Sequence, residues 1–371
     1  MDILYIGFLL GHGGDAMQML ELASSMSARG ARVRIVVPLL DTTRGFAELC
    51  EQRNLAVVRT PWIQCSIDGV PQRPLDMIRL FLKYDAPITH FHTGDCCLPR
   101  TALIARRLLR RRRAFVTVQS PYETVQPGEP RAAAWAQAAE NQLHLVLCPS
   151  EHSRRYQMRM GVPEGRVAVV RNSVNLQRFG SGNASVARKS LGLTEDTPIV
   201  LFSSRLDDQK RPLDAVAAFA RVAAQFPNAQ LVFLGTGKLE GDLRAAVHQS
   251  GLDARVRFVG HQDNVEDWLA AATIWMLPTE RENFSLAVLE AMAAGTAILS
   301  TNCAGNDEVL IDGENALTTA VGDVEGMAAG LGRLLNDPAL RARLAANARA
   351  TAANYSAERM ADSYERAYSG R

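Results

Sequence analysis

The fold is indicated most clearly by residues 199–212, which read IVLFSSRLDDQKRP. The apolar run 199–203 predicts a buried strand, and the charged residues after it predict a turn. An amphipathic segment follows at 212–225 and predicts a helix. A strand, a polar turn and a helix in this order form the unit from which α/β sheets are built.

The same unit recurs along the whole chain. Near its start, an apolar run at 3–9 is followed by Gly11, Gly13 and Gly14 and then by a predicted helix over 16–28. The remaining predicted strands are the short apolar runs at 33–37, 89–92, 115–118, 145–147, 231–234, 256–259, 273–277 and 297–300. The pattern restarts after about residue 170, so the chain is predicted to contain two sheets.

Two doubly wound α/β domains are therefore expected, over residues 1–170 and 171–356. The Gly-, Ser- and Asn-rich segment 180–185 lies near the predicted join. A last helix, over about 357–371, is expected to pack back on the first domain. Ligands of open α/β sheets bind outside the carboxyl ends of the strands, so the functional residues are expected to face a cleft between the domains.

Composition narrows the function. The formal net charge of +2 argues against a nucleic-acid-binding protein. The six cysteines show no C-x-x-C or zinc spacing, so reduced thiols in a cytoplasmic protein are expected. We expect no signal peptide, and no apolar run approaches the roughly 20 residues that span a bilayer.

A pair of glutamates stands in the strongest motif, PTERENFSLAVLEAM at 278–292. A predicted helix starts near Ser285, and the N–H groups of a helix start form a site for phosphate. Glu282 precedes this helix, and Glu290 lies about two turns inside it. Carboxylates beside a phosphate site are reasonable if they accept hydrogen bonds from ribose and sugar hydroxyls. The alternative is an ordinary acidic helix start with a solvated face.

Positive charge is expected in the turn after the strand 199–203. Arg205 and Lys210 lie there and could neutralise the charge of a leaving diphosphate. The adjacent Asp207 and Asp208 also allow an ordinary polar loop. The sequence has no D-x-D arrangement for a divalent metal, so no metal is expected, and arginine and lysine would replace it.

With these motifs the chain resembles glycosyltransferase family four, retaining enzymes of the GT-B fold. Glu282 and Glu290 match the family's E-x₇-E motif, and the loop from Arg205 to Lys210 matches its diphosphate-binding loop. Other landmarks follow in the family's order, at residues 13–14, 149–151, 171–175, 235–237 and 259–261. The resemblance covers essentially the whole chain and is best in its second half.

The resemblance implies roles for these residues. Glu290 should bind the ribose hydroxyls of a nucleotide-sugar donor, with a UDP-sugar favoured, and Glu282 should hold the transferred sugar. Arg205 and Lys210 should stabilise the leaving nucleoside diphosphate. The residues implied to bind the donor are Gly13, Gly14, Gly235, Gly237, His261, Asn283, Phe284, Ser285, Leu286 and Glu290.

The chain departs from the family pattern at several positions. Asn283, Ser285 and Ser173 stand where glycines are common. Gln119 stands after the strand 115–118 where many relatives carry a histidine, and an amide cannot act as a general base near neutral pH.

The residues that would contact the acceptor are predicted with fewer motifs. His12 and His92 are placed at loop positions that face the cleft, and together with Gln119 and Tyr122 they are candidates for contact with an acceptor. The acceptor could be a carbohydrate, a glycolipid or a small natural product. The basic run from Arg106 to Arg113 is either a solvated helix face or a contact with the inner face of a membrane.

Three alternatives stay open. Residues 11–16 fit the glycine pattern of an NAD-dependent dehydrogenase, but Pro38 stands where that family has an acid. A GT-B nucleotide-sugar epimerase would share the donor site and would release an epimerised donor. A binder without catalysis would hold the donor and never turn it over.

Overall fold

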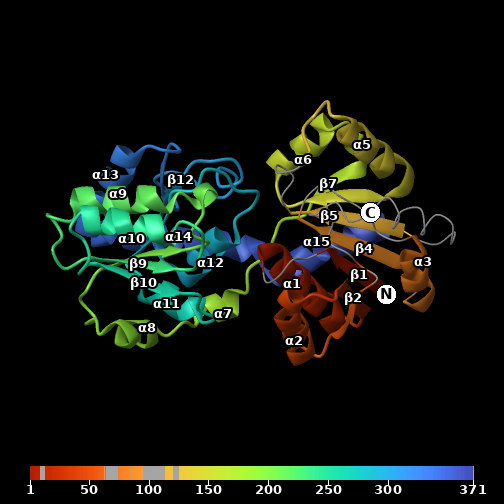
Figure 1. Cartoon of the computed structure of the whole chain (residues 1–371), viewed down its shortest axis with the longest axis horizontal. Coiled ribbons are helices and arrows are strands. Elements are labelled where there is room, and N and C mark those ends of the chain that lie inside the picture. Colours follow the sequence, from red (N-terminus) through yellow and green to blue (C-terminus); the bar gives the residue numbers. More distant parts are fainter. Residues whose placement is uncertain are drawn as a thin grey trace. The chain divides into compact units, whose positions relative to one another are not determined.

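The computed structural model describes residues 1–8, 13–61, 63, 74–84, 86–94, 113–119 and 125–370. The chain divides into two compact units, Met1–Ser173 with Ala357–Arg371, and Val174–Ser356 (Figure 1). The predicted boundary at 170 lies within a few residues of the observed one, and the helix after Ser356 belongs to the first unit. No helix in the described ranges is both long enough and apolar enough to cross a membrane.

The first unit is built on a seven-stranded parallel sheet with the order β3-β2-β1-β4-β5-β6-β7. Its strands are β1 (Asp2–Phe8), β2 (Arg32–Pro38), β3 (Ala56–Thr60), β4 (Ile88–Thr93), β5 (Arg113–Val118), β6 (Leu145–Cys148) and β7 (Val167–Val169). Its helices are α1 (Gly14–Ala28), η1 (Asp41–Thr43), α2 (Arg44–Gln52), α3 (Pro74–Lys83), α5 (Pro130–Gln142), α6 (Glu151–Arg159), η3 (Glu164–Arg166) and α15 (Ala357–Ser369).

Helices cover both faces of this sheet because successive strand residues point to opposite sides. In β1, Ile3 and Tyr5 belong to a core shared with α1, α2 and α15. Leu4 and Ile6 belong to a second core shared with α3, α5 and α6. Strands buried on both faces read as continuous apolar runs, which is why the central strands could be predicted from sequence.

The second unit is built on a six-stranded parallel sheet with the order β10-β9-β8-β11-β12-β13. Its strands are β8 (Ile199–Ser203), β9 (Gln230–Leu234), β10 (Val256–Gly260), β11 (Ile274–Leu277), β12 (Ala297–Thr301) and β13 (Leu317–Thr319). Its helices are α7 (Leu176–Gly180), α8 (Ala184–Leu191), η4 (Asp208–Lys210), α9 (Pro212–Val222), α10 (Glu240–Gln249), α11 (Val265–Ala271), α12 (Leu286–Ala294), α13 (Val324–Asn336), α14 (Pro338–Ala352) and η5 (Ala353–Tyr355). Helix α9 packs with α10 and α13, while α7, α8, α11 and α12 form a second packed group (Figure 1).

Segment 180–185, predicted to lie near the join, is a turn inside the second unit. It connects α7 to α8, and Asn183 caps α8 by accepting a hydrogen bond from Ser185 N. A Cβ atom on Gly182 would lie 2.1 Å from the carbonyl oxygen of Glu266 in α11. The small and polar residues therefore serve a close contact and a helix cap, not a linker.

Candidate active site

The order of the second sheet brings two charged segments together. Strands β8 and β11 are parallel neighbours, so their carboxyl ends lie at the same edge of the sheet. The predicted cationic turn, with η4, follows β8, and the glutamate motif follows β11. The two segments touch directly, since Glu280 N donates to Gln209 O at 2.8 Å.

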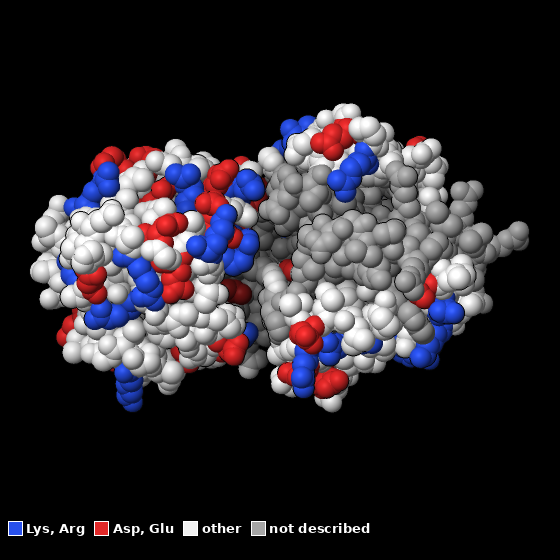
Figure 2. Space-filling model, in the orientation of Figure 1, with Lys and Arg blue, Asp and Glu red and all other residues white. Residues whose placement is uncertain are grey.

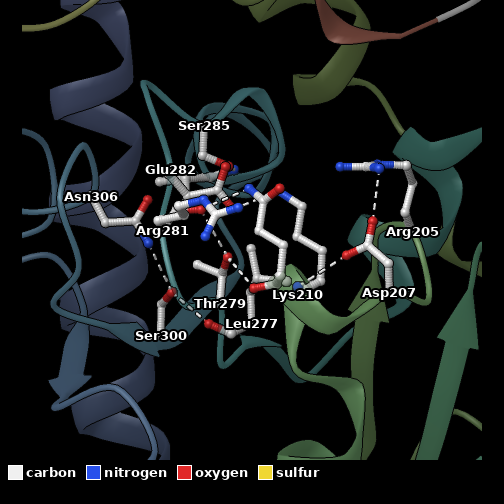
Figure 3. A network of polar contacts seen from close by, with 12 residues as sticks. Arg205, Asp207, Lys210, Leu277, Thr279, Arg281, Glu282, Ser285, Ser300 and Asn306 are labelled. Atoms are coloured by element: carbon white, nitrogen blue, oxygen red, sulfur yellow. Dashed lines mark hydrogen bonds and ion pairs between the residues drawn. The ribbon is translucent and has the colours of Figure 1, made fainter. Parts of the chain in front are cut away.

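Lys210 and Glu282 form an ion pair at the centre of this site (Figure 3). Lys210 Nζ lies 2.6 Å from Glu282 Oε1, and the side chains are only 12% and 8% exposed. Either charge alone would be costly to bury, so each stabilises the other in place. The structure thus joins two of the three predicted catalytic residues.

Gln209 connects the two loops and was missed by the sequence analysis. Its carbonyl oxygen accepts from Glu280 N and, at 3.1 Å, from Thr279 Oγ1. Its side-chain amide donates to Arg281 O at 2.9 Å. These bonds fix the position of the residue next to Lys210. The only signal in the sequence was its place between Asp208 and Lys210.

The segment after β12 supports the glutamate loop from its other side. Glu282 N donates to Ala304 O at 3.1 Å, and Thr301 Oγ1 donates to Thr279 O at 2.5 Å. Gly305 has φ +87°, and a Cβ atom there would lie 2.5 Å from Glu282 O. Only glycine therefore allows this approach. Neither Gly305 nor its neighbour Asn306, which donates to Ser300 Oγ at 3.3 Å, was predicted.

Arg205, the third predicted catalytic residue, is not part of the buried pair. Its Nη1 lies 2.7 Å from Asp207 Oδ2, and its side chain is 69% exposed. Asp207 Oδ1 also accepts from Lys210 N at 3.1 Å. An exposed ion pair is weak, so Arg205 can exchange this carboxylate for another anion at little cost.

Helix α12 starts as predicted. Ser285 is its N-cap, and Ser285 Oγ accepts from Val288 N at 3.4 Å. Phe284 is buried against the ring of Tyr355, with 5.3 Å between ring centroids. Its side chain therefore belongs to the core, and only the main chain of Phe284 is suited to the predicted donor contact. The N–H groups of the first turn of a helix can bind an anion.

The glycines after β9 are explained by close packing against the cationic turn. Gly235 has φ +137°, and a Cβ atom there would lie 2.1 Å from Ser204 O. A Cβ atom on Gly237 would lie 2.3 Å from Leu206 O. Leu206 N in turn donates to Thr236 O at 3.0 Å. Both glycines thus shape the loop that carries Arg205, and their contact with a donor stays a prediction.

Glu290 lies in the second turn of α12 and is partly exposed. Burial raises the pKa of Glu290 to about 7, while the Arg178 guanidinium acts to lower that pKa and the Glu266 carboxylate adds to the rise. The carboxyl group is thus close to half-ionised at neutral pH. Its ionisation depends on residues that the sequence analysis did not select.

His261, predicted at the nucleotide pocket, follows β10 and is exposed. Its Nε2 lies 3.4 Å from Asp263 Oδ1. The described residues include no group of three or more His, Cys, Asp and Glu side chains able to hold a metal ion. Over the described part of the face drawn in Figure 2, acidic and basic side chains are interspersed on both units.

His92 lies in β4, so its predicted loop position is wrong. Its side chain is 1% exposed because it points into the core beneath α1 and α15, where its ring centroid is 4.3 Å from that of His90. Burial lowers the pKa of His92 to about 3, so the ring is neutral. Neither ring nitrogen has a hydrogen-bond partner within the described part of the chain.

A buried network beside His92 was also missed. His90 Nδ1 lies 2.5 Å from Tyr368 Oη, and His90 Nε2 lies 2.8 Å from Thr117 Oγ1. Thr117 Oγ1 lies 3.0 Å from Tyr364 Oη. Burial lowers the pKa of His90 well below its usual value, so this ring is neutral too. The network ties α15 to β4 and β5.

Gln119 lies directly after β5, as predicted, and is buried. Its main-chain N donates to Thr93 O at 3.0 Å, and its Nε2 donates to Asn172 Oδ1 at 3.3 Å. Gly13 is the N-cap of α1, and Gly14 is its first residue. His12, Tyr122 and residues 106–112 of the basic run lie outside the described residues.

Comparison with known proteins agrees with this architecture. Residues 184–351 match the family model "Glycosyl transferases group 1", and residues 12–178 match "Glycosyltransferase Family 4". The chain belongs to glycosyltransferase family 4.

Its curated relatives differ in what they make. The chain is 32% identical over 187 residues to the lipopolysaccharide core biosynthesis glycosyltransferase LpsE of Rhizobium meliloti, covering 50% of this chain and 54% of the relative. It is 30% identical over 207 residues to the N-acetyl-alpha-D-glucosaminyl L-malate synthase of Bacillus anthracis, covering 56% and 54%. The chain spans about half the length of the curated relatives it matches.

Solved structures show the fold. The Anabaena protein Alr3699/HepE in complex with UDP-glucose matches with a TM-score of 0.85 at 19% identity, covering 100% of both chains. The sucrose-phosphate synthase of Thermosynechococcus elongatus matches with a TM-score of 0.81 at 21% identity, covering 100% of this chain and 99% of that one. With its two parallel α/β sheets, this family 4 glycosyltransferase has the GT-B fold, as predicted.

Proposed function

We propose that this family 4 glycosyltransferase moves a hexose-type sugar from a UDP-sugar to a hydroxyl group of an acceptor, with retention at the anomeric carbon. The observation that carries this proposal is the buried Lys210–Glu282 pair, 2.6 Å apart, beside the N-terminus of α12. A cation and the N–H groups of a helix start suit a diphosphate, and a carboxylate suits the hydroxyl groups of a sugar. The UDP-glucose complex of the similar Anabaena protein supports the choice of nucleotide.

The diphosphate would be bound by Lys210, Arg205 and the first N–H groups of α12. Lys210 is already fixed by Glu282, and the exposed Arg205 side chain can leave Asp207. These charges need no reorganisation of solvent when negative charge develops on the leaving UDP. We propose that they take the place of a divalent metal in this reaction.

The two glutamates would accept hydrogen bonds from hydroxyl groups. Glu282 uses one carboxylate oxygen for Lys210, which leaves the other for the transferred sugar. Glu290 would bind the ribose hydroxyls, and the segment 283–286 would line the sugar and phosphate. Gly235, Gly237 and His261 would border the nucleotide.

Retention by double displacement needs a carboxylate nucleophile on the opposite face of the sugar. The matched family motifs provide none, so we propose a front-side attack. The acceptor oxygen bonds to the anomeric carbon as the bond from that carbon to the UDP oxygen breaks. The acceptor proton passes to an oxygen of the leaving β-phosphate, and the released UDP carries it away.

The acceptor would be bound by the first unit. Gln119 can donate and accept hydrogen bonds there, and neutral groups suit the hydroxyls of a carbohydrate, a glycolipid or a small natural product. We keep His12 and Tyr122 as further candidates. Contact of residues 106–113 with a membrane surface, with the protein on the cytoplasmic side, is part of the same proposal.

A thermal-shift panel with UDP, GDP, ADP and NAD, run on the wild type and on Glu290→Ala, tests the function. A nucleotide present at 100 times its Kd should stabilise the wild type by roughly 2.7 kcal/mol. We expect UDP to do so and the variant to lose the shift. A shift with NAD alone would refute the donor site. An epimerised nucleotide sugar formed without any acceptor would refute the transfer reaction.

A further inference from the structure

Arg178, in the short helix α7, connects two segments that border the proposed nucleotide site. Its Nε donates to Glu266 Oε2 at 2.9 Å, and its Nη2 lies 2.7 Å from the same oxygen. Its Nη2 also donates to the carbonyl oxygen of Asp263 at 2.6 Å. One guanidinium therefore holds both the first turn of α11 and the loop after β10 that carries His261.

Main-chain contacts also fix the position of α7 against α11. Gly182, just after α7, approaches the Glu266 carbonyl so closely that a side chain would not fit. Asn183 N donates to Asp267 Oδ1 at 2.7 Å. Arg178 is itself oriented at its helix start, because its N donates to Asn175 Oδ1 at 2.9 Å. The guanidinium is thus held in place and is not a freely moving surface charge.

Glu290 belongs to the same cluster. Helix α12 packs against α7 and α11, which bring the Arg178 cation and the Glu266 carboxylate to bear on Glu290. Helix α14, packed on another side, places Arg349 at the far end of α12, where it donates to Ala294 O at 2.7 Å. Strand β12 has no charged residue. Burial is the largest influence on the pKa of Glu290, and the Arg178 cation and the Glu266 carboxylate, which are bonded to each other, act on that pKa in opposite directions.

We propose that Arg178 is a positioning residue of the nucleotide site, which fixes the loop 261–263 and provides the positive charge that favours an ionised Glu290, ready to accept the ribose hydroxyls. This inference rests on the proposed function, because it assumes that Glu290 meets a ribose. Glu266 has the opposite effect on Glu290: its negative charge disfavours ionisation of Glu290, and it forms an ion pair with Arg178. The two residues together set the charge that Glu290 presents to the donor.

The test is a pair of variants that should move the Glu290 titration in opposite directions. In Arg178→Met the lost cation should raise the midpoint of Glu290 ionisation by about one pH unit, and in Glu266→Gln the lost carboxylate should lower it. Isotope-labelled glutamate side chains followed by NMR give the midpoint without any ligand, with Glu290→Gln identifying the signal. Calorimetric titration with UDP at several pH values gives the affinity.

We expect UDP binding to weaken about tenfold at pH 7 in Arg178→Met and to recover at higher pH. Arg178→Lys should keep the wild-type midpoint. Arg221→Met is the matched control: it removes the ion pair between Arg221 on α9 and Glu325 on α13 and should change neither quantity. Equal midpoints in the wild type, Arg178→Met and Glu266→Gln would overturn the proposal. Shifted midpoints in a protein whose wild type does not bind UDP would refute the proposed function, and with it the positioning role.

Discussion

The carboxyl ends of the two sheets carry polar groups of different kinds. At the edge of the second sheet the groups are charged: Lys210 and Glu282 are buried as a pair, and Arg205 is exposed beside Asp207. In the first unit two buried groups near strand ends are neutral, His92 within β4 and Gln119 after β5, although the charged residues Glu151 and Arg171 follow β6 and β7. A diphosphate requires charge, whereas sugar hydroxyls require neutral donors and acceptors, so the contrast is consistent with a donor site in one unit and an acceptor site in the other.

The two units also avoid the cost of buried charge in different ways. The second unit pairs opposite charges, and removing either partner leaves an uncompensated ion. The first unit buries groups in their neutral form, since burial lowers the pKa of His90 and His92 and raises the pKa of Tyr364 to about 12. A substitution at the buried pair of the second unit should leave a charge without its partner, whereas one in the first unit should leave a neutral buried group without a partner. Acid should also change the stability of the two units in different ways.

The largest effect is expected from Lys210→Ala. Loss of the cation that meets the leaving diphosphate should lower the turnover of sugar transfer by about 10² to 10³-fold, with a smaller loss in donor affinity. Lys238→Ala is the control, because Lys238 forms an exposed pair with Asp208 and should matter little. Steady-state kinetics check this. An equal loss in turnover and binding would show that Lys210 acts uniformly on ground state and transition state.

Gly235→Ala should destabilise the second unit by about 2 to 3 kcal/mol, because the new Cβ atom would meet Ser204 O and φ is +137°. Chemical denaturation measures the change in the free energy of unfolding. Gly241→Ala, in α10 with open space around it, is the control and should be neutral or slightly stabilising. Equal stability of Gly235→Ala and wild type would contradict the packing described for this turn.

Tyr368→Phe should destabilise the first unit by about 1 to 3 kcal/mol, because it leaves His90 Nδ1 buried without a partner. Urea unfolding followed by a probe in the first unit measures this. The matched change is Tyr84→Phe at a partly exposed position, which should stay within about 0.5 kcal/mol of wild type. A larger loss in Tyr84→Phe than in Tyr368→Phe would break the argument for a buried network.

Acid should weaken the first unit. The folded pKa of His92 lies near 3, below the ordinary value of 6.5, so its contribution is fully present above pH 6.5 and is lost as the pH falls below it. The loss should approach about 1.4 kcal/mol per pH unit for each such histidine. Glu290 acts oppositely in the second unit, since its raised pKa favours the folded state as the pH falls through 7.

Thermal unfolding between pH 7 and pH 5 checks the acid prediction. His92→Phe should lose part of the pH dependence, whereas replacement of the exposed His248 should leave it unchanged. The same dependence in His92→Phe and wild type would show that other groups control the acid sensitivity.

The sequence was sufficient for the parts of the fold that are buried on both faces. Strands β3, β7 and β13 were missed: all three lie at sheet edges, and β7 and β13 have only three residues each, whereas the five-residue edge strand β10 was predicted. Edge strands need less apolar surface, and their short patterns resemble loops. The motif residues Lys210 and Glu282 were each predicted as site residues, but their contact was not, because it depends on which strands are neighbours in the sheet.

The rest of the candidate site depends on contacts between residues far apart in the chain. Gln209, Gly305 and Arg178 act through main-chain atoms or through partners on other elements, such as Glu266 for Arg178. No local pattern distinguishes such an arginine from a solvated one. His92 was misplaced for a related reason, because a polar residue at a strand end is indistinguishable by pattern from the first residue of a loop.

The return of α15 to the first unit has a consequence for synthesis. The second unit is one continuous segment, Val174–Ser356, whereas the first unit needs residues from both sides of it. On the ribosome the later unit can therefore finish folding before the earlier one. Until α15 emerges, the sheet face around Tyr5, His90 and Phe115 lacks the helix that covers it. A stalled or shortened chain would present this apolar face to chaperones and to its own copies.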